Sequence, residues 1–178
     1  MNVIETSLQD CVIIEPTIYG DERGFFLETF QTERYAEAAG IHAPFVQDNH
    51  SRSSIGVLRG LHFQKTKPQG KLVRAVRGEV FDVAVDIRKG STTFGRWEGV
   101  ILSENNKRQF WVPPGFAHGF LVLSEVADFE YKCTDYYDPS DEGCVLWNDP
   151  DLNIEWPLDN PVLSPKDSNG QLLSVVSM

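Results

Sequence analysis

The stretch that decides the fold class reads Val80-Phe81-Asp82-Val83-Ala84-Val85-Asp86-Ile87. Its odd-numbered positions are all apolar, whereas its even-numbered positions mix small apolar residues with two aspartates. A repeat of two residues places these two sets on opposite faces of a β-strand, and Gly78 supplies the turn before it. The stretch therefore predicts a strand with one wholly apolar face.

The same pattern extends outward on both sides, as short apolar runs separated by turn signals from residue 45 to 135. We predict a hairpin that joins strands 97–102 and 108–112 through the polar turn 104–107. Around Tyr131, apolar and polar residues alternate, which points this tyrosine inward. Many short strands with almost no helix predict an all-β sandwich or barrel.

The N-terminal part shows weaker strand patterns and one helix. Residues 11–18 alternate weakly up to a polar turn at 19–24, and residues 25–30 form a short apolar run. Residues 32–39 are the only predicted helix, which Thr32 can cap and Gly40 can end.

The C-terminal part, from about residue 139, is a proline-rich, loop-rich tail. We expect it to wrap the barrel and to close one of its ends. With 178 residues and no linker, the chain is predicted to form one domain, 1–178.

Composition excludes several function classes. The net charge of −10 argues against a nucleic-acid partner, because an acidic surface repels phosphate polymers. No apolar run is long enough for a membrane span, and the start lacks the features of a signal peptide. Three cysteines without a CxxC motif indicate reduced thiols, so we expect a cytoplasmic protein.

His62 is the strongest candidate for a catalytic base. It lies in the strand-like run 58–64, close to Arg59 and Gly60. Strict alternation would put Arg59 and His62 on opposite faces, but glycine inside a strand often marks a bulge. We therefore predict a bulge at Gly60 that directs both side chains into one pocket. The competing interpretation is a hydrogen-bonded core histidine.

The other histidines are weaker candidates. His118 ends the motif P-x-G-x-x-H, which is typical of the second metal-binding motif of cupin barrels. The HxH pair that cupin metal sites also need is missing, and two isolated imidazoles make a poor metal site. We therefore predict no metal. His42 is expected on the surface, and His50 as a hydrogen-bonding residue.

Three cations lie in or beside turn-and-strand segments: Arg23, Arg59 and Lys71. Arginine side chains suit phosphate oxygens, which they bind with two hydrogen bonds. Lys71 shares its parity with Val73 and Ala75 and is expected to point into the barrel. A buried lysine needs an anionic partner or a lowered pKa.

Taken together, the motifs resemble those of the dTDP-4-dehydrorhamnose 3,5-epimerase family from about residue 11 to 167. The resemblance is carried by the segments Gly20–Phe26, Gln47–Ser51, Leu58–Gln64, Lys71–Val73, Phe81–Arg88, Pro114–Phe120 and Trp147–Pro150. It implies a cupin-type double-stranded β-helix (jelly roll), a homodimer, and an enzyme that uses no metal or cofactor.

The resemblance also implies a reaction and a set of site residues. The family inverts C3 and C5 of dTDP-4-dehydro-6-deoxy-D-glucose to give dTDP-4-dehydro-L-rhamnose. His62 resembles the family's base, Asp167 its dyad partner and Tyr131 its acid, while Lys71 is our candidate for stabilising the enolate. The residues that resemble nucleotide-sugar contacts are Arg23, Glu28, Gln47, Asp48, Asn49, Arg59, Lys71, His118, Glu142 and Lys166, with Tyr137 stacking on thymine.

Four alternatives stay open at this point. A 3-epimerase would leave C5 alone, and a 3,4-ketoisomerase would share the barrel, although the presence of both His62 and Tyr131 disfavours it. A non-catalytic carbohydrate-binding jelly roll would explain the aromatic residues. A metal-dependent cupin oxygenase would require stoichiometric metal in the purified protein.

Overall fold

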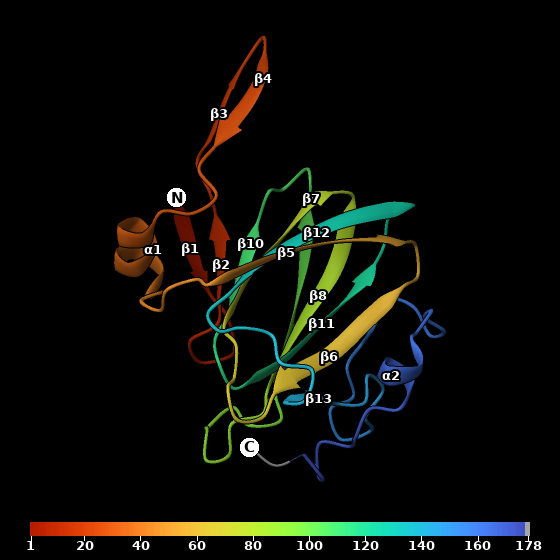
Figure 1. The fold of residues 1–178 in the computed structure, drawn as a ribbon. Helices are drawn as coiled ribbons and strands as arrows, with labels where there is room; N and C mark the ends of the chain where they lie inside the picture. Colours follow the sequence, from red (N-terminus) through yellow and green to blue (C-terminus); the bar gives the residue numbers. More distant parts are fainter. Residues whose placement is uncertain (177–178) are drawn as a thin grey trace.

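Two antiparallel β-sheets pack face to face in the computed structural model, which describes residues 1–176 (Figure 1). The larger sheet contains, in spatial order, β1 (Asn2–Glu5), β2 (Val12–Glu15), β10 (Gln109–Val112), β7 (Lys71–Arg77), β12 (Val126–Cys133) and β5 (Gln47–Ser54). The smaller sheet contains β13 (Glu142–Cys144), β6 (Leu58–Gln64), β11 (Phe116–Val122), β8 (Glu79–Asp86) and β9 (Trp97–Ser103). The predicted cupin-type jelly roll is confirmed.

Strand β8 is buried on both faces, although its sequence pattern predicted only one wholly apolar face. Val80 and Ala84 project between the sheets, where they join the main core around Phe110 and Phe129. The odd-numbered apolar residues of β8 pack on the outer face, against Leu152 and other residues of the C-terminal tail. The tail thus covers the outer face of the smaller sheet. The sequence had instead predicted that it closes one end of the barrel.

Helix α1 (Thr32–Ala39) has the predicted bounds and lies on the outer face of the larger sheet. Gly40 ends it in the left-handed conformation, with φ of 68°, as expected. The cap is Gln31, whose side chain accepts from the Arg34 N–H, so the prediction of Thr32 as cap is wrong. A second helix, α2 (Pro165–Ser168), was not predicted, because a single turn leaves no periodic pattern.

The predicted hairpin between 97–102 and 108–112 is wrong in its pairing. Strand β9 pairs with β8 in the smaller sheet, whereas β10 pairs with β2 and β7 in the larger one. The turn between them is real: the Asn106 side chain hydrogen-bonds the Ser103 N–H and the Ile101 carbonyl. The chain crosses here from one sheet to the other, a step that local polarity does not reveal.

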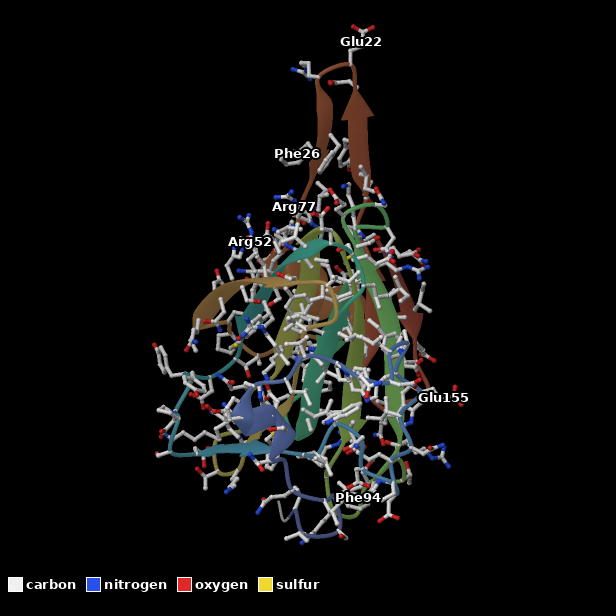
Figure 2. All side chains as sticks on the ribbon, turned by 90° about the vertical axis from the view of Figure 1, so that its right-hand side faces the viewer. Glu22, Phe26, Arg52, Arg77, Phe94 and Glu155 are labelled. Atoms are coloured by element: carbon white, nitrogen blue, oxygen red, sulfur yellow. The ribbon has the colours of Figure 1, made fainter. Side chains whose placement is uncertain are left out.

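A two-stranded hairpin, called the arm below, projects away from the barrel (Figures 1 and 2). It consists of β3 (Ile18–Asp21) and β4 (Gly24–Leu27), with its turn at 22–23. The predicted turn at 19–24 was too wide, and residues 11–18 are split into two strands at Pro16. Phe25 and Phe26 on the arm are 61% and 68% exposed.

The helices were compared with the length and apolar character that a membrane span requires. Neither helix within residues 1–176 has the length and apolar character needed to cross a bilayer.

Candidate active site

The site is organised by a bulge in β6 at Gly60. His62 lies opposite His118 on β11, and Arg59 lies opposite Phe120, so β6 carries one extra residue between these pairs. Gly60 has φ of 121°, and an added Cβ would lie 2.6 Å from the Gly119 Cα, so only glycine fits. The bulge itself is confirmed, but Arg59 is exposed and does not line the cavity that His62 enters, so the predicted shared pocket is not seen.

His62 forms a dyad with Asp167, which is 105 residues away in the sequence. The His62 Nε2 lies 2.6 Å from Asp167 Oδ1, and the two side chains are 27% and 5% exposed. Burial acts to raise the Asp167 pKa, but hydrogen bonds from His62 and Ser164 outweigh it and lower the pKa. An ionised Asp167 accepts a hydrogen bond from the His62 Nε2–H, which leaves the lone pair of His62 on Nδ1.

Ser164 holds Asp167 in place from the start of α2. Its side chain caps the helix by accepting from the Asp167 N–H at 3.1 Å, and its hydroxyl donates to Asp167 Oδ2 at 2.7 Å. The Gly60 N–H lies 3.4 Å from the other carboxylate oxygen. The bulge in β6 and the short helix α2, which lies beside β6 in Figure 1, together fix the carboxylate against the imidazole.

His62 opens into a cavity of about 240 Å³ between the two sheets. Strands of both sheets contribute to its walls, so the cavity has two chemically different sides. The lining residues are Gln47, Asn49, His62, Phe63, Gln64, Gln69, Lys71, Tyr131, Tyr137 and Glu142.

Tyr131 and Lys71 face His62 from the larger sheet, with the parity that the sequence predicted. Burial raises the pKa of Tyr131, only partly countered by the charge of Arg59, so the phenol keeps its proton. Burial lowers the pKa of Lys71, while the negative charges of Glu142 and Asp82 act in the opposite direction. The cavity therefore holds a potential base, a protonated phenol and a buried amine.

The mouth of the cavity combines an aromatic ring with paired charges. Tyr137 is 48% exposed, and its hydroxyl donates to Glu142 Oε2 at 2.8 Å. Lys166 pairs with the same carboxylate, and Glu142 Oε1 lies 3.9 Å from His62 Nδ1. Burial acts to raise the Glu142 pKa, but hydrogen bonds from Lys166 and Tyr137 outweigh it and lower the pKa.

Six of the predicted contact residues do not line this cavity: Arg23, Glu28, Asp48, Arg59, His118 and Lys166. Arg23 lies at the tip of the arm with its side chain 89% exposed, and Glu28 is paired with Arg34 beside α1. Asp48 points to the outer face, where it pairs with Lys132. His118 is buried inside the barrel against Asp82. Arg59 is exposed at the rim and donates to Ser53 at 2.9 Å.

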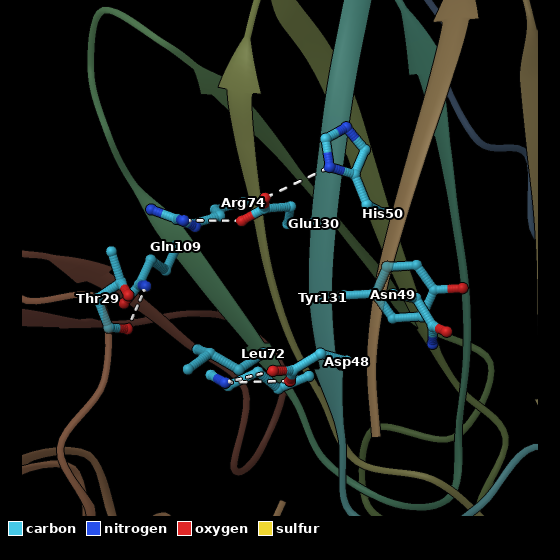
Figure 3. A pocket seen from close by; sticks show the side chains of 10 residues that line it. Thr29, Asp48, Asn49, His50, Leu72, Arg74, Gln109, Glu130 and Tyr131 are labelled. Atoms are coloured by element: carbon cyan, nitrogen blue, oxygen red, sulfur yellow. Dashed lines mark hydrogen bonds and ion pairs between the residues drawn. The ribbon is translucent and has the colours of Figure 1, made fainter. Parts of the chain in front are cut away.

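A larger hollow, of about 350 Å³, lies on the outer face of the larger sheet. Its charged side chains already pair with one another: Figure 3 shows Arg74 with Glu130, and Lys132 pairs with Asp48 at 3.0 Å. His50 lies there as well, 3.5 Å from Glu130. Because these charges are satisfied within the chain, the smaller cavity around His62 is the better candidate for chemistry.

Three residues near the site were missed by the sequence analysis. Ser164 was detectable, because Ser-Pro-x-Asp is a helix-start pattern. Asp82 shared an inward face with Val80 and Ala84, which was a usable signal of a buried carboxylate. Cys144 gave no signal, yet its sulfur lies near His62 and Asp167, with all three potential ligand atoms within 4.8 Å of one another.

The Cys144 cluster has the residue types of a metal site but an unsuitable thiol. Burial raises the Cys144 pKa to about 12, so the thiol stays protonated near neutral pH. Metals bind the thiolate, and the Asp167 oxygen is already engaged by His62. The geometry therefore suits an oriented imidazole better than a coordinated ion.

Comparison with known proteins agrees with this geometry. Residues 5–174 match the model of the family described as dTDP-4-dehydrorhamnose 3,5-epimerase. A protein of that name from Shigella flexneri is 60% identical over 172 residues, covering 96% of this chain and 95% of the relative.

Solved structures extend the comparison. An epimerase from Legionella pneumophila, described as dTDP-6-deoxy-D-glucose-3,5-epimerase in complex with dTDP-4-keto-L-rhamnose, superposes with a TM-score of 0.96 at 62% identity, covering 99% and 94% of the two chains. A 3'-monoepimerase from Streptomyces bikiniensis, in complex with dTDP-quinovose, superposes with a TM-score of 0.89 at 38% identity, covering 95% and 86%. The resemblance of the motifs is confirmed, and the chain belongs to the dTDP-4-dehydrorhamnose 3,5-epimerase family.

Proposed function

We propose that this enzyme inverts C3 and C5 of dTDP-4-dehydro-6-deoxy-D-glucose and gives dTDP-4-dehydro-L-rhamnose. The observation that carries the proposal is the His62–Asp167 dyad, which opens into the same cavity as Tyr131 and Lys71. The C4 ketone acidifies the hydrogens on both neighbouring carbons, so one base can serve both centres in turn. No cofactor is needed for this chemistry.

His62 is the proposed base, acting through Nδ1. The Asp167 carboxylate holds the proton on Nε2 and stabilises the imidazolium that forms when Nδ1 takes the sugar proton. Histidine titrates near neutrality, which suits this role. When the C–H bond breaks, its electron pair moves into an enolate with the charge on the C4 oxygen.

Tyr131 is the proposed acid. Inversion requires that the new proton arrives on the face opposite to the one that lost it. His62 comes from the smaller sheet and Tyr131 from the larger, so a sugar between the sheets meets one group on each face. The enolate takes the phenol proton at carbon and the C4 carbonyl re-forms. His62 and Tyr131 then return to their starting states by proton exchange with water.

Lys71 is the proposed stabiliser of the enolate oxygen. An ammonium group inside a cavity acts on developing negative charge much more strongly than it would in water. The negative charges of Glu142 and Asp82 favour its protonated form against the effect of burial. Its fixed position in β7, beside β12, supports an approach to the C4 oxygen from the side of Tyr131.

The nucleotide part of the substrate is proposed to bind at the mouth. Tyr137 provides an exposed ring on which thymine can stack, and its backbone N–H donates to the Gln47 side chain at 2.9 Å. Arg59 and Lys166 supply positive charge for the diphosphate. Gln47, Asn49 and Glu142 offer hydrogen bonds, and His118 lies deeper, on the sugar side.

We also propose a cytoplasmic homodimer in which the arm completes the partner's site. Arg23 and Glu28 resemble substrate contacts, yet they lie outside their own chain's cavity, and the arm exposes Phe25 and Phe26 (Figure 2). A second copy that covers these rings and receives Arg23 accounts for both facts.

Mixed dimers test the arm directly. Co-expressed His62→Ala and Arg23→Ala chains should recover part of the activity that each variant lacks alone, because one site of the mixed dimer contains both wild-type residues. No recovery in dimers verified by light scattering would contradict transfer of the arm.

The function is tested by incubation with dTDP-4-dehydro-6-deoxy-D-glucose in D₂O followed by NMR. We expect deuterium at C3 and C5 and the appearance of the L-configured product. No exchange at either carbon would refute the epimerase and favour a carbohydrate-binding jelly roll. Exchange at C3 alone would select the second candidate, a 3-epimerase, which the similarity to a 3'-monoepimerase keeps in view.

A further inference from the structure

A second pair of an imidazole and a carboxylate lies inside the barrel, separate from His62 and Asp167. The His118 Nε2 lies 2.9 Å from both Oδ1 and Oδ2 of Asp82. The Asp82 side chain has no exposed surface, and that of His118 is 7% exposed. The proposed function assigns no role to Asp82 beyond its charge.

The register places His118 on the same side as the base. His118 and His62 are directly opposite in the antiparallel pair of β11 and β6, so both side chains project into the barrel interior. The His118 ring also stacks on Phe129, with 6.2 Å between ring centroids and 19° between the planes. Phe129 in turn contacts the Tyr131 ring, with centroids 6.1 Å apart.

The second ring nitrogen of His118, Nδ1, is not fully buried. Nδ1 makes no hydrogen bond to residues 1–176, and within that range no fully buried polar side-chain atom lacks a partner. Nδ1 therefore keeps some accessible surface. Asp82 holds the Nε2 side of the ring from within the core, which leaves Nδ1 as the nitrogen that a ligand in the barrel can reach.

Asp82 differs in its energetics from Asp86, a buried carboxylate on the same strand. Hydrogen bonds from Arg88, Ser91 and Thr93 outweigh burial at Asp86 and lower its pKa to about 2, so its charge stabilises the fold. At Asp82, burial outweighs the effect of His118 and Lys71 and raises the pKa. Burial thus penalises the ionised form of Asp82, and this cost to stability grows as the pH rises through the raised pKa.

A buried carboxylate that costs stability is expected where function requires it. An asparagine of nearly the same shape would avoid the cost of burying a charge. The presence of aspartate at this position therefore points to a role beyond packing.

We propose that Asp82 is a positioning residue that fixes His118 by its Nε2, so that Nδ1 is presented to the ketosugar beside His62. This inference rests on the proposed function and deepens it, because it assigns the sugar a second oriented imidazole. A rigid ring that hydrogen-bonds a sugar oxygen helps to hold C3 and C5 within reach of the base, which is where orientation accelerates a reaction.

The first test compares Asp82→Asn with Asp86→Asn. Asp82→Asn should lower kcat by about 10–100-fold, the range found when the carboxylate partners of metal-binding histidines are removed. KM should change less than about threefold, since the nucleotide is held elsewhere. The melting temperature should stay equal or rise. Asp86→Asn, the matched control, should lower the melting temperature and leave kcat unchanged.

The second test asks whether Asp82 acts through His118. In a His118→Phe background, which keeps the ring stacked on Phe129, Asp82→Asn should cause no further loss of kcat. Deuterium exchange into the substrate over long incubations keeps slow variants measurable. An equal loss in both backgrounds, or a kcat of Asp82→Asn within twofold of wild type, would overturn the proposal.

The two proposals fail in distinguishable ways. If wild-type enzyme exchanges no deuterium at C3 or C5, the proposed function fails and takes the role of Asp82 with it. If wild type is active and Asp82→Asn is equally active, the epimerase stands and only the positioning role is lost.

Discussion

Replacing Asp167 by asparagine should disable the base while leaving the barrel folded. The Asp167 carboxylate lies 2.6 Å from the His62 Nε2 and is 5% exposed, so it acts in a partly desolvated place. A charge pair at about 4 Å is worth about 1 kcal/mol in water and about 4 kcal/mol at an effective dielectric of about 20. His62 remains 27% exposed, which argues for a value of about 3 kcal/mol.

This energy translates into a loss of rate. Because about 1.4 kcal/mol corresponds to a factor of ten, losing the stabilisation of the imidazolium costs about 10²-fold in kcat. The asparagine amide adds to the loss whenever it donates to Nε2, since the proton then moves to Nδ1 and blocks the base. In serine hydrolases, a related aspartate-to-asparagine change lowers kcat about 10⁴-fold for this reason.

The assay is deuterium incorporation at C3 and C5, measured by NMR with kcat and KM from product formation. The rate of deuterium incorporation should fall by the same factor at C3 and at C5, because one base is proposed to serve both carbons. Asp149→Asn is the matched control: Asp149 is a buried carboxylate of the same tail that accepts from the N–H groups of Asp151 and Leu173. It should lower the melting temperature and leave kcat unchanged. A folded Asp167→Asn enzyme with kcat within threefold of wild type would refute the dyad.

Four further predictions follow from the site and its surroundings. Tyr131→Phe should slow completed inversion more than initial proton loss, so deuterium should still enter the unreacted substrate when product formation is strongly reduced. Undiminished inversion would exclude Tyr131 as the acid. Tyr137→Ala should weaken dTDP binding about tenfold in calorimetry with kcat unchanged, as expected when base stacking is lost. Asp86, with its pKa lowered from 3.8 to about 2, should contribute about 2 kcal/mol of stability above pH 4 that disappears towards pH 2; urea unfolding should show this difference between wild type and Asp86→Asn. Purified enzyme treated with EDTA should retain full activity and contain no stoichiometric iron, manganese or zinc, and loss of activity restored by one of these metals would contradict a metal-free mechanism.

Sequence patterns predicted the features that depend on local alternation. The two faces of residues 80–87, the inward orientation of Tyr131 and the parity of Lys71 all follow from the two-residue repeat of a strand. The bulge at Gly60 was predictable as well, because a glycine inside a strand is typical of a bulge or of a close approach by a ligand.

Pairing across the barrel was not predictable from local pattern. The turn at 104–107 gives the same signal whether the following strand folds back or crosses to the other sheet, and here it crosses. Asp167 entered only through family resemblance, because nothing near residue 167 indicates a contact with residue 62. The neighbourhood of Cys144 likewise depends on long-range packing.

The distance in sequence between the proposed base, His62, and Asp167 links the proposed catalysis to local unfolding. Asp167 is held by one turn of helix, in a tail whose backbone joins the barrel through isolated bridges such as Val57 to Val162. Segments of this kind open at lower free energy than the central strands of a barrel. Each opening removes the orienting carboxylate while both sheets stay intact, so heat should inactivate the enzyme reversibly before it melts the barrel.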